Sequence, residues 1–141
     1  MPAKLHQVVP SFAFAVGGGV LPAVGMPFLL ALTVGDGVTG DLDWTGIPGL
    51  TFRITGAWTQ KTTGPGGVGD TLQLQSATGV PVTNAMDVNV AAGVLVRATT
   101  IDDLNAAQVV PTGFGLRVRR VNGAAGGNVL NATVYVEAVR L

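Results

Sequence analysis

The stretch 49-GLTFRITGAWTQK-61 alternates apolar and polar side chains with a period of two. The apolar row, which includes Gly56, comprises Leu50, Phe52, Ile54 and Trp58, and the polar row comprises Thr51, Arg53, Thr55 and Thr59. Such alternation predicts a strand with one face in a core and the other in water. The glycine-rich segment TTGPGGVGD follows, and alternation then resumes at Leu72. We therefore predict a strand, a hairpin turn and a second strand.

Similar patterns recur along the rest of the chain. Further strands are predicted over 26–34, 71–76, 80–84, 86–91, 94–100, 114–121 and 129–140. The uninterrupted apolar run 26–34 predicts burial on both faces, and 101–109 predicts a helical turn. The last two strands, joined by NGAAGGN, are predicted to form a hairpin with Leu116, Val118, Val134, Val136 and Ala138 inward. Turn signals every eight to twelve residues or so are typical of a β-sandwich or jelly roll.

The first residues differ from the rest of the chain. Phe12 and Phe14 alternate with small residues before Gly17, Gly18 and Gly19 interrupt regular pairing. We predict an all-β single domain with an extended N-terminal arm: residues 1–30 form the arm and first strand, and 31–141 form the sandwich. The arm is expected to pack on a neighbouring subunit or along a sheet edge.

The composition restricts the classes of function. Charged residues make up 11% of the chain, against about 25% in average soluble proteins. Eight basic residues balance eight acidic ones, so no global field favours nucleic acid. The uncharged window between Lys4 and Asp36 contains several glycines and prolines, which argue against a membrane-spanning helix. The low charge instead indicates surface covered by other protein subunits.

Glycine and aspartate motifs have simple structural explanations. Matches to G-x-G-x-x-G begin at Gly35 and Gly64, but neither opens a helix, as a dinucleotide site requires. Asp36, Asp41 and Asp43 suit solvated turns, and calcium binding at these acidic turns is left open.

No catalytic constellation is evident. His6, the sole histidine, lies in the predicted arm, which is a poor place for a general base. Asp102 and Asp103 are adjacent and point in different directions, so they do not form an acid/base pair. We predict that the protein is not an enzyme and needs no cofactor.

Arg117, Arg119 and Arg120 form the one basic cluster. Two interpretations stand: a solvated strand face, or intersubunit pairs with acidic turns at Asp41 and Asp43 or at Asp102 and Asp103. Phe12, Phe14 and Phe28 are the apolar candidates for contacts with a partner. These six aromatic and basic residues form the predicted interface.

Three segments carry a family resemblance: AWTQKTTGPGGVGDTLQLQ, GVPVTNAMDVNVAAGVLVRATTIDDLNAAQVVPTG and FGLRVRRVNGAAGGNVLNATVYVEAVRL. Residues 50–141 resemble the small capsid decoration, or cement, proteins of tailed bacteriophages. The resemblance implies a jelly-roll module on the outer surface of the virion. It also implies a homotrimer that bridges neighbouring subunits of the major capsid protein.

A different class of function remains as an alternative: a β-sandwich that binds carbohydrate or a receptor on a phage tail or cell surface. Such sites stack sugar rings on exposed aromatic side chains. Trp44, Trp58 and Tyr135 are the candidates. Because Trp58 is in register with core residues, it is expected to be buried, and Trp44 is the better candidate.

Overall fold

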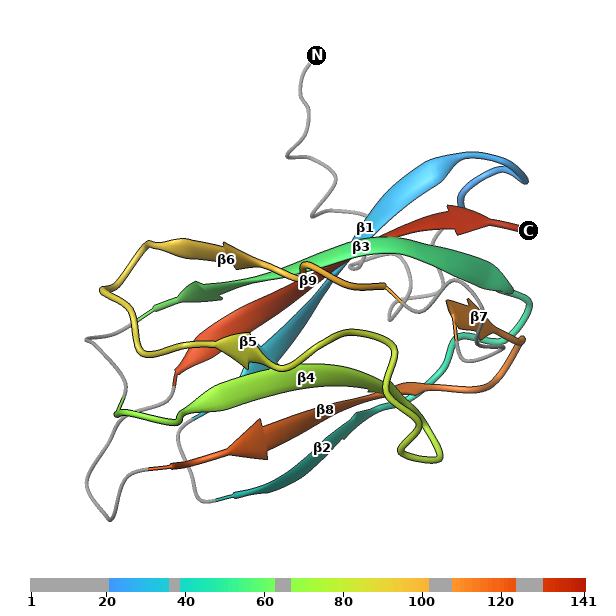
Figure 1. Cartoon of the computed structure of the whole chain (residues 1–141). Coiled ribbons are helices and arrows are strands. Elements are labelled where there is room, and N and C mark those ends of the chain that lie inside the picture. The colour runs from blue at the N-terminus through green and yellow to red at the C-terminus, as the bar shows by residue number, and fades with distance from the viewer. Residues whose placement is uncertain (1–20, 36–38, 63–66, 102–107, 124–130) are drawn as a thin grey trace.

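A computed structural model of the protein describes residues 21–35, 39–62, 67–101, 108–123 and 131–141. These residues form two layers of strands (Figure 1). The strands are β1 (Pro27–Val34), β2 (Gly40–Trp44), β3 (Phe52–Lys61), β4 (Thr71–Ser76), β5 (Met86–Asp87), β6 (Leu95–Arg97), β7 (Val109–Val110), β8 (Leu116–Val121) and β9 (Ala132–Arg140).

The strand order identifies the architecture. One sheet, here called sheet A, has the order β1-β9-β3-β6, with β7 also paired to β3, and sheet B has the order β2-β8-β4-β5. The pairs are antiparallel. With the two-residue β7 set aside, the described residues form eight strands in two sheets, in the strand order of a jelly roll. The predicted all-β sandwich is confirmed.

Both predicted hairpins are wrong. β3 lies in sheet A and β4 in sheet B, and likewise β8 lies in sheet B and β9 in sheet A. The two strands of each predicted hairpin therefore lie in different layers (Figure 1). Alternation shows that a strand has one buried face, but it is the same whether the next strand pairs beside it or packs opposite it.

The core lies between the sheets and follows the alternation. Phe28 and Phe52 meet edge to face within it, with ring centroids 5.5 Å apart. The inward positions predicted in the last two long strands are confirmed: Leu116, Val118, Val134, Val136 and Ala138 are each at most 2% exposed. Strand β1 also alternates, with exposed or half-buried residues between buried ones, so the prediction that both its faces are buried is wrong.

A β-bulge in β3 changes the facing of its second half. Ile54 pairs with Ala138, but Gly56 pairs with Glu137, so Thr55 is the extra residue. A bulge of this kind reverses the facing of every later side chain relative to strict alternation. Thr59 and Lys61 are consequently buried, each 1% exposed, while Trp58 points outward and is half-buried.

The middle of the chain is less regular than predicted. Segment 80–84 contributes only the isolated bridges Gln75↔Pro81 and Thr83↔Ile101, since proline has no N–H for a ladder. The strands expected over 86–91 and 94–100 shrink to β5 and β6. Most of the predicted helical turn, residues 102–107, and most of the arm, residues 1–20, lie outside the described residues.

Candidate functional site

The outer face of sheet B is a ladder of charged and amide side chains. Arg117 Nε donates to Asp43 Oδ1 at 2.8 Å, and an Arg119 guanidinium nitrogen donates to Asp41 Oδ1 at 3.0 Å. Arg117 also lies 3.5 Å from Asp41 Oδ2. The hydrogen bond from Arg117 holds the pKa of Asp43 below its usual value. Asp41 and Asp43 lie in strand β2, not in a turn, and pair with arginines of the same chain.

Arginines of the same chain therefore contact Asp41 and Asp43, because strand β2 lies beside β8. Pairing of these carboxylates between subunits stays a prediction. Arg120 donates to the carbonyl of Gly35 at 2.7 Å. The alternative pair, Asp102 and Asp103, lies outside the described residues. Arginine partners also make Asp41 and Asp43 poor calcium ligands, and no cluster of metal-binding side chains occurs in the described part of the chain.

The phenylalanines predicted at an interface are divided. Phe28 is 7% exposed and belongs to the core. The prediction that its ring contacts a partner on the surface is therefore wrong. Phe28 faces inward because side chains alternate along a strand, and its neighbours in β1, Pro27 and Leu29, face outward. Phe12 and Phe14 lie outside the described residues and stay predictions.

The outer face of sheet A carries an aromatic row. Trp58 stacks on Tyr135, with ring centroids 5.2 Å apart and 18° between the planes. The Arg97 guanidinium carbon lies 4.9 Å from the Trp58 ring centroid. The register places Ala31, Tyr135, Trp58 and Arg97 in one line across β1, β9, β3 and β6. Trp44 is also half-buried, but it packs against the core whereas Trp58 faces outward. The expectation that Trp58 is the buried tryptophan and Trp44 the better candidate for sugar stacking is therefore reversed.

Glu137 lies in the next row, opposite Gly56. An Arg97 guanidinium nitrogen contacts Glu137 Oε1 at 3.0 Å. A side chain at position 56 would collide with that same carboxylate oxygen. The glycine therefore leaves the space in which the Glu137 carboxylate and Arg97 meet.

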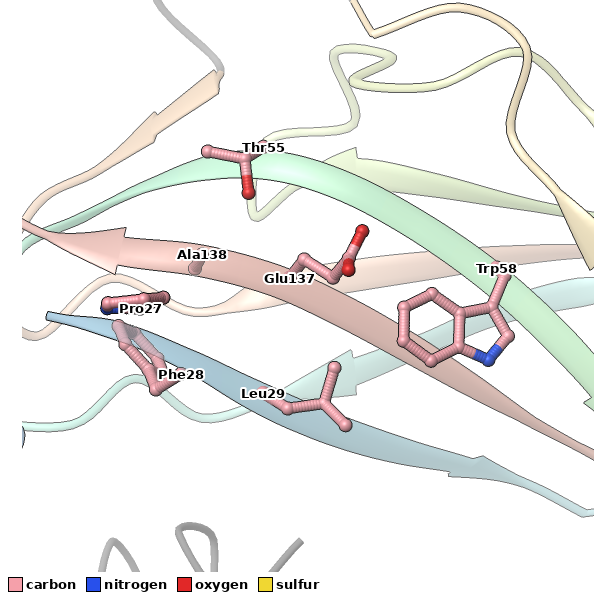
Figure 2. A pocket seen from close by; sticks show the side chains of 7 residues that line it. All are labelled: Pro27, Phe28, Leu29, Thr55, Trp58, Glu137 and Ala138. Atoms are coloured by element: carbon pink, nitrogen blue, oxygen red, sulfur yellow. The ribbon is translucent and has the colours of Figure 1, made fainter. Parts of the chain in front are cut away.

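A hollow of about 270 Å³ opens beside this pair. Its lining comprises Pro27, Phe28, Leu29, Thr55, Trp58, Glu137 and Ala138. Figure 2 shows the Trp58 ring and the Glu137 carboxylate along one side, with Leu29 and Pro27 on neighbouring β1. The lining combines apolar side chains of β1 with a carboxylate, a hydroxyl and an indole from β9 and β3. Of these residues, the sequence analysis named Phe28 as a contact candidate and Trp58 as an aromatic candidate. The hollow itself was not predicted, because the bulge at Thr55 leaves no clear trace in the alternation.

One end of the sandwich exposes large apolar side chains. Val24, Met26, Phe114 and Leu141 lie just outside the ends of β1, β8 and β9 and are 72%, 51%, 57% and 46% exposed. We refer to these four residues as the end patch. The Gly25 N–H donates to the Arg140 carbonyl at 2.8 Å, which holds the segment before β1 against the end of β9. The start of β1 and the C-terminus lie at the same end in Figure 1.

The described residues include no helix that is long and apolar enough to span a membrane. No family model, curated protein or solved structure matches the chain. The features that bear on function are therefore the sequence resemblance and two surfaces, the end patch and the outer face of sheet A.

Proposed function

We propose that the protein is a structural component of a tailed-bacteriophage virion. It decorates the outer surface of the icosahedral capsid and cements it by bridging neighbouring subunits of the major capsid protein. In this proposal binding depends on contact area and a rigid scaffold, and no reaction is catalysed.

The end patch is the observation that carries this proposal. It comprises four large apolar side chains that are each about half exposed or more. Apolar patches on soluble proteins usually mark interaction sites. The predicted arm, with Phe12 and Phe14, precedes Leu21 in the sequence, and in this proposal arm and patch contact the same partner.

The low charge supports the same proposal from the whole chain. With 11% charged residues, an isolated copy has few groups to keep it soluble at high concentration. Assembly as a homotrimer on a coat lattice covers part of that surface. Because Arg117 and Arg119 already pair within the chain, we expect them to contribute little to contacts between subunits. We therefore assign those contacts to apolar groups.

Cosedimentation with phage heads that lack this protein tests the proposal. We expect the wild-type chain to bind such heads at saturable stoichiometry, and the double variant Met26→Asp/Leu141→Asp to bind at least about tenfold more weakly, because two carboxylates would be desolvated at the contact. Val68→Asp is the matched control, since Val68 is 80% exposed but lies outside the patch.

The proposed function would be contradicted if the wild-type chain did not bind the phage heads. If Val68→Asp lost as much binding as the double variant, the end patch would not be the surface that contacts the capsid. Light scattering of the purified chain tests the trimer separately, and a monomer at all concentrations would contradict the trimer.

A further inference from the structure

We propose that the hollow on the outer face of sheet A binds one neutral pyranose ring of a glycan. The site is formed by Trp58, Glu137, Thr55 and Leu29. This inference goes beyond the decorating role and concerns a different surface from the end patch.

The size of the hollow suits a single sugar ring. Its volume of about 270 Å³ is just below the roughly 300–1,000 Å³ of typical small-molecule sites. A nucleotide cofactor would be too large for it. Thr55 is exposed, and Leu29, Trp58 and Glu137 are half-buried, so a ligand can enter from solvent.

The distribution of polar and apolar groups also suits a pyranose, which has C–H groups on its faces and hydroxyl groups around its rim. Leu29 and Pro27 of β1, with the edge of Trp58, provide apolar contact. Glu137 of β9 and Thr55 of β3 provide an acceptor and a hydroxyl. A carboxylate has about four acceptor positions, so the contact with Arg97 leaves capacity for sugar hydroxyls.

Charge selects against other small ligands. The Glu137 carboxylate disfavours phosphates and carboxylates in the hollow. Arg97 already stacks on Trp58 and pairs with Glu137, so a cationic ligand would have to displace it. A neutral ligand rich in hydroxyl groups meets neither obstacle.

Three local features preorganise the site. The bulge at Thr55 turns Trp58 outward, Tyr135 stacks on Trp58, and Gly56 leaves the space that the Glu137 carboxylate occupies. Bulges commonly re-aim a side chain next to a functional site. Rigid placement of ligand-contacting groups lowers the entropic cost of binding.

Intrinsic fluorescence tests the inference in the full chain carrying Trp44→Phe, which leaves Trp58 as the only tryptophan. The probes are the methyl glycosides of glucose, galactose, mannose and N-acetylglucosamine. We expect at least one to change the Trp58 emission saturably, with a dissociation constant on the order of 1 mM for so small a ligand.

Variants locate the binding. Glu137→Gln should weaken it about tenfold or more, because a charged acceptor is lost, and Thr55→Val should weaken it severalfold. Arg119→Gln on sheet B is the matched control and should leave binding unchanged. Circular dichroism checks each fold, and Thr55, being exposed, provides a test even if Glu137→Gln does not fold.

The inference is overturned if none of the four glycosides gives a saturable change up to about 100 mM. It is equally overturned if Glu137→Gln and Thr55→Val both bind like the parent chain. Binding to phage heads is measured in a separate experiment. The glycan-binding proposal and the capsid-binding proposal can therefore fail independently.

Discussion

The two outer faces of the sandwich use the same strand pairing for different purposes. On sheet B, Asp41 and Asp43 face Arg119 and Arg117 across β2 and β8, and the charges neutralise one another within the chain. On sheet A, the Trp58 and Tyr135 rings stand beside a hollow with one carboxylate. A face whose charges are paired internally has few groups left to contact a partner. The face with aromatic groups and a hollow has such groups available.

Local backbone geometry produces this difference. Strand β8 alternates regularly, with Arg117 and Arg119 outward and Leu116 and Val118 inward. Strand β3 contains a bulge that turns Trp58 outward, and Gly56 leaves room for the Glu137 carboxylate, which faces outward in the regular alternation of β9. Irregularities of this kind weaken local pairing, and on sheet A they coincide with the hollow.

The largest expected effect comes from matched glycine substitutions, one on each sheet. A Cβ at Gly115 would collide with the Trp44 carbonyl oxygen and lie 3.2 Å from the Gly46 nitrogen, so β2 and β8 must separate. Gly115→Ala should lower the free energy of unfolding by roughly 3 kcal/mol or more. Gly56→Ala meets only the ends of two flexible side chains, with a collision at the Glu137 carboxylate and an ordinary contact of 3.5 Å to an Arg97 guanidinium nitrogen, and should cost about 1 kcal/mol or less. Urea unfolding measures both, and equal losses would contradict the comparison.

The second prediction concerns the aromatic row. Trp58→Ala removes the stack on Tyr135 and the contact with Arg97, and should lower the free energy of unfolding by about 2 kcal/mol. Trp58→Phe keeps an aromatic ring and should recover most of that loss. A loss well above about 4 kcal/mol for Trp58→Ala would indicate a core tryptophan, and the two faces would then be less different than we describe.

A smaller effect is expected from the charge ladder. Arg117→Gln breaks the contacts with Asp43 and Asp41, but solvent screens these exposed groups. The melting temperature should fall less than in Trp58→Ala, and the difference from wild type should shrink in about 1 M sodium chloride. A salt-independent loss as large as that of Trp58→Ala would show that sheet B depends on its ladder for stability.

The smallest effect is a pH dependence of stability. Because Arg117 lowers the pKa of Asp43 in the folded state, the stabilisation is fully present above the unfolded pKa of about 4 and is lost as pH falls through the lowered folded pKa. Wild type should therefore lose more stability than Asp43→Asn below about pH 4. Identical acid unfolding curves for the two proteins would contradict the assigned pair.

Much of the fold could be predicted from the alternation. Strands β1, β3, β4, β8 and β9 lie where the pattern predicts them, because a half-buried strand must repeat every two residues. The facing of Ile54 was predicted correctly and that of Trp58 was not. The bulge between them adds one residue to β3, and no residue type in TGA requires it.

The pairing and the site were harder to predict. The alternation of Leu72 and Leu74 is the same whether β4 pairs with β3 in a hairpin or lies in the opposite sheet. The sheet to which each strand belongs could therefore not be predicted. The arginine cluster was visible, but its partners Asp41 and Asp43 were assigned to a turn because GDLDW has few strand-forming residues. The hollow depends on Glu137 and Leu29, which come together only through the β1–β9 register.

The outward position of Trp58 is the central claim, and nuclear Overhauser contacts of its indole ring test it most directly. We expect contacts from the Trp58 ring protons to the ring protons of Tyr135, whose centroid lies 5.2 Å away, and none to the methyl groups of Ile54. Strong contacts to Ile54 and Leu50, with none to Tyr135, would place Trp58 in the core and contradict the account of sheet A.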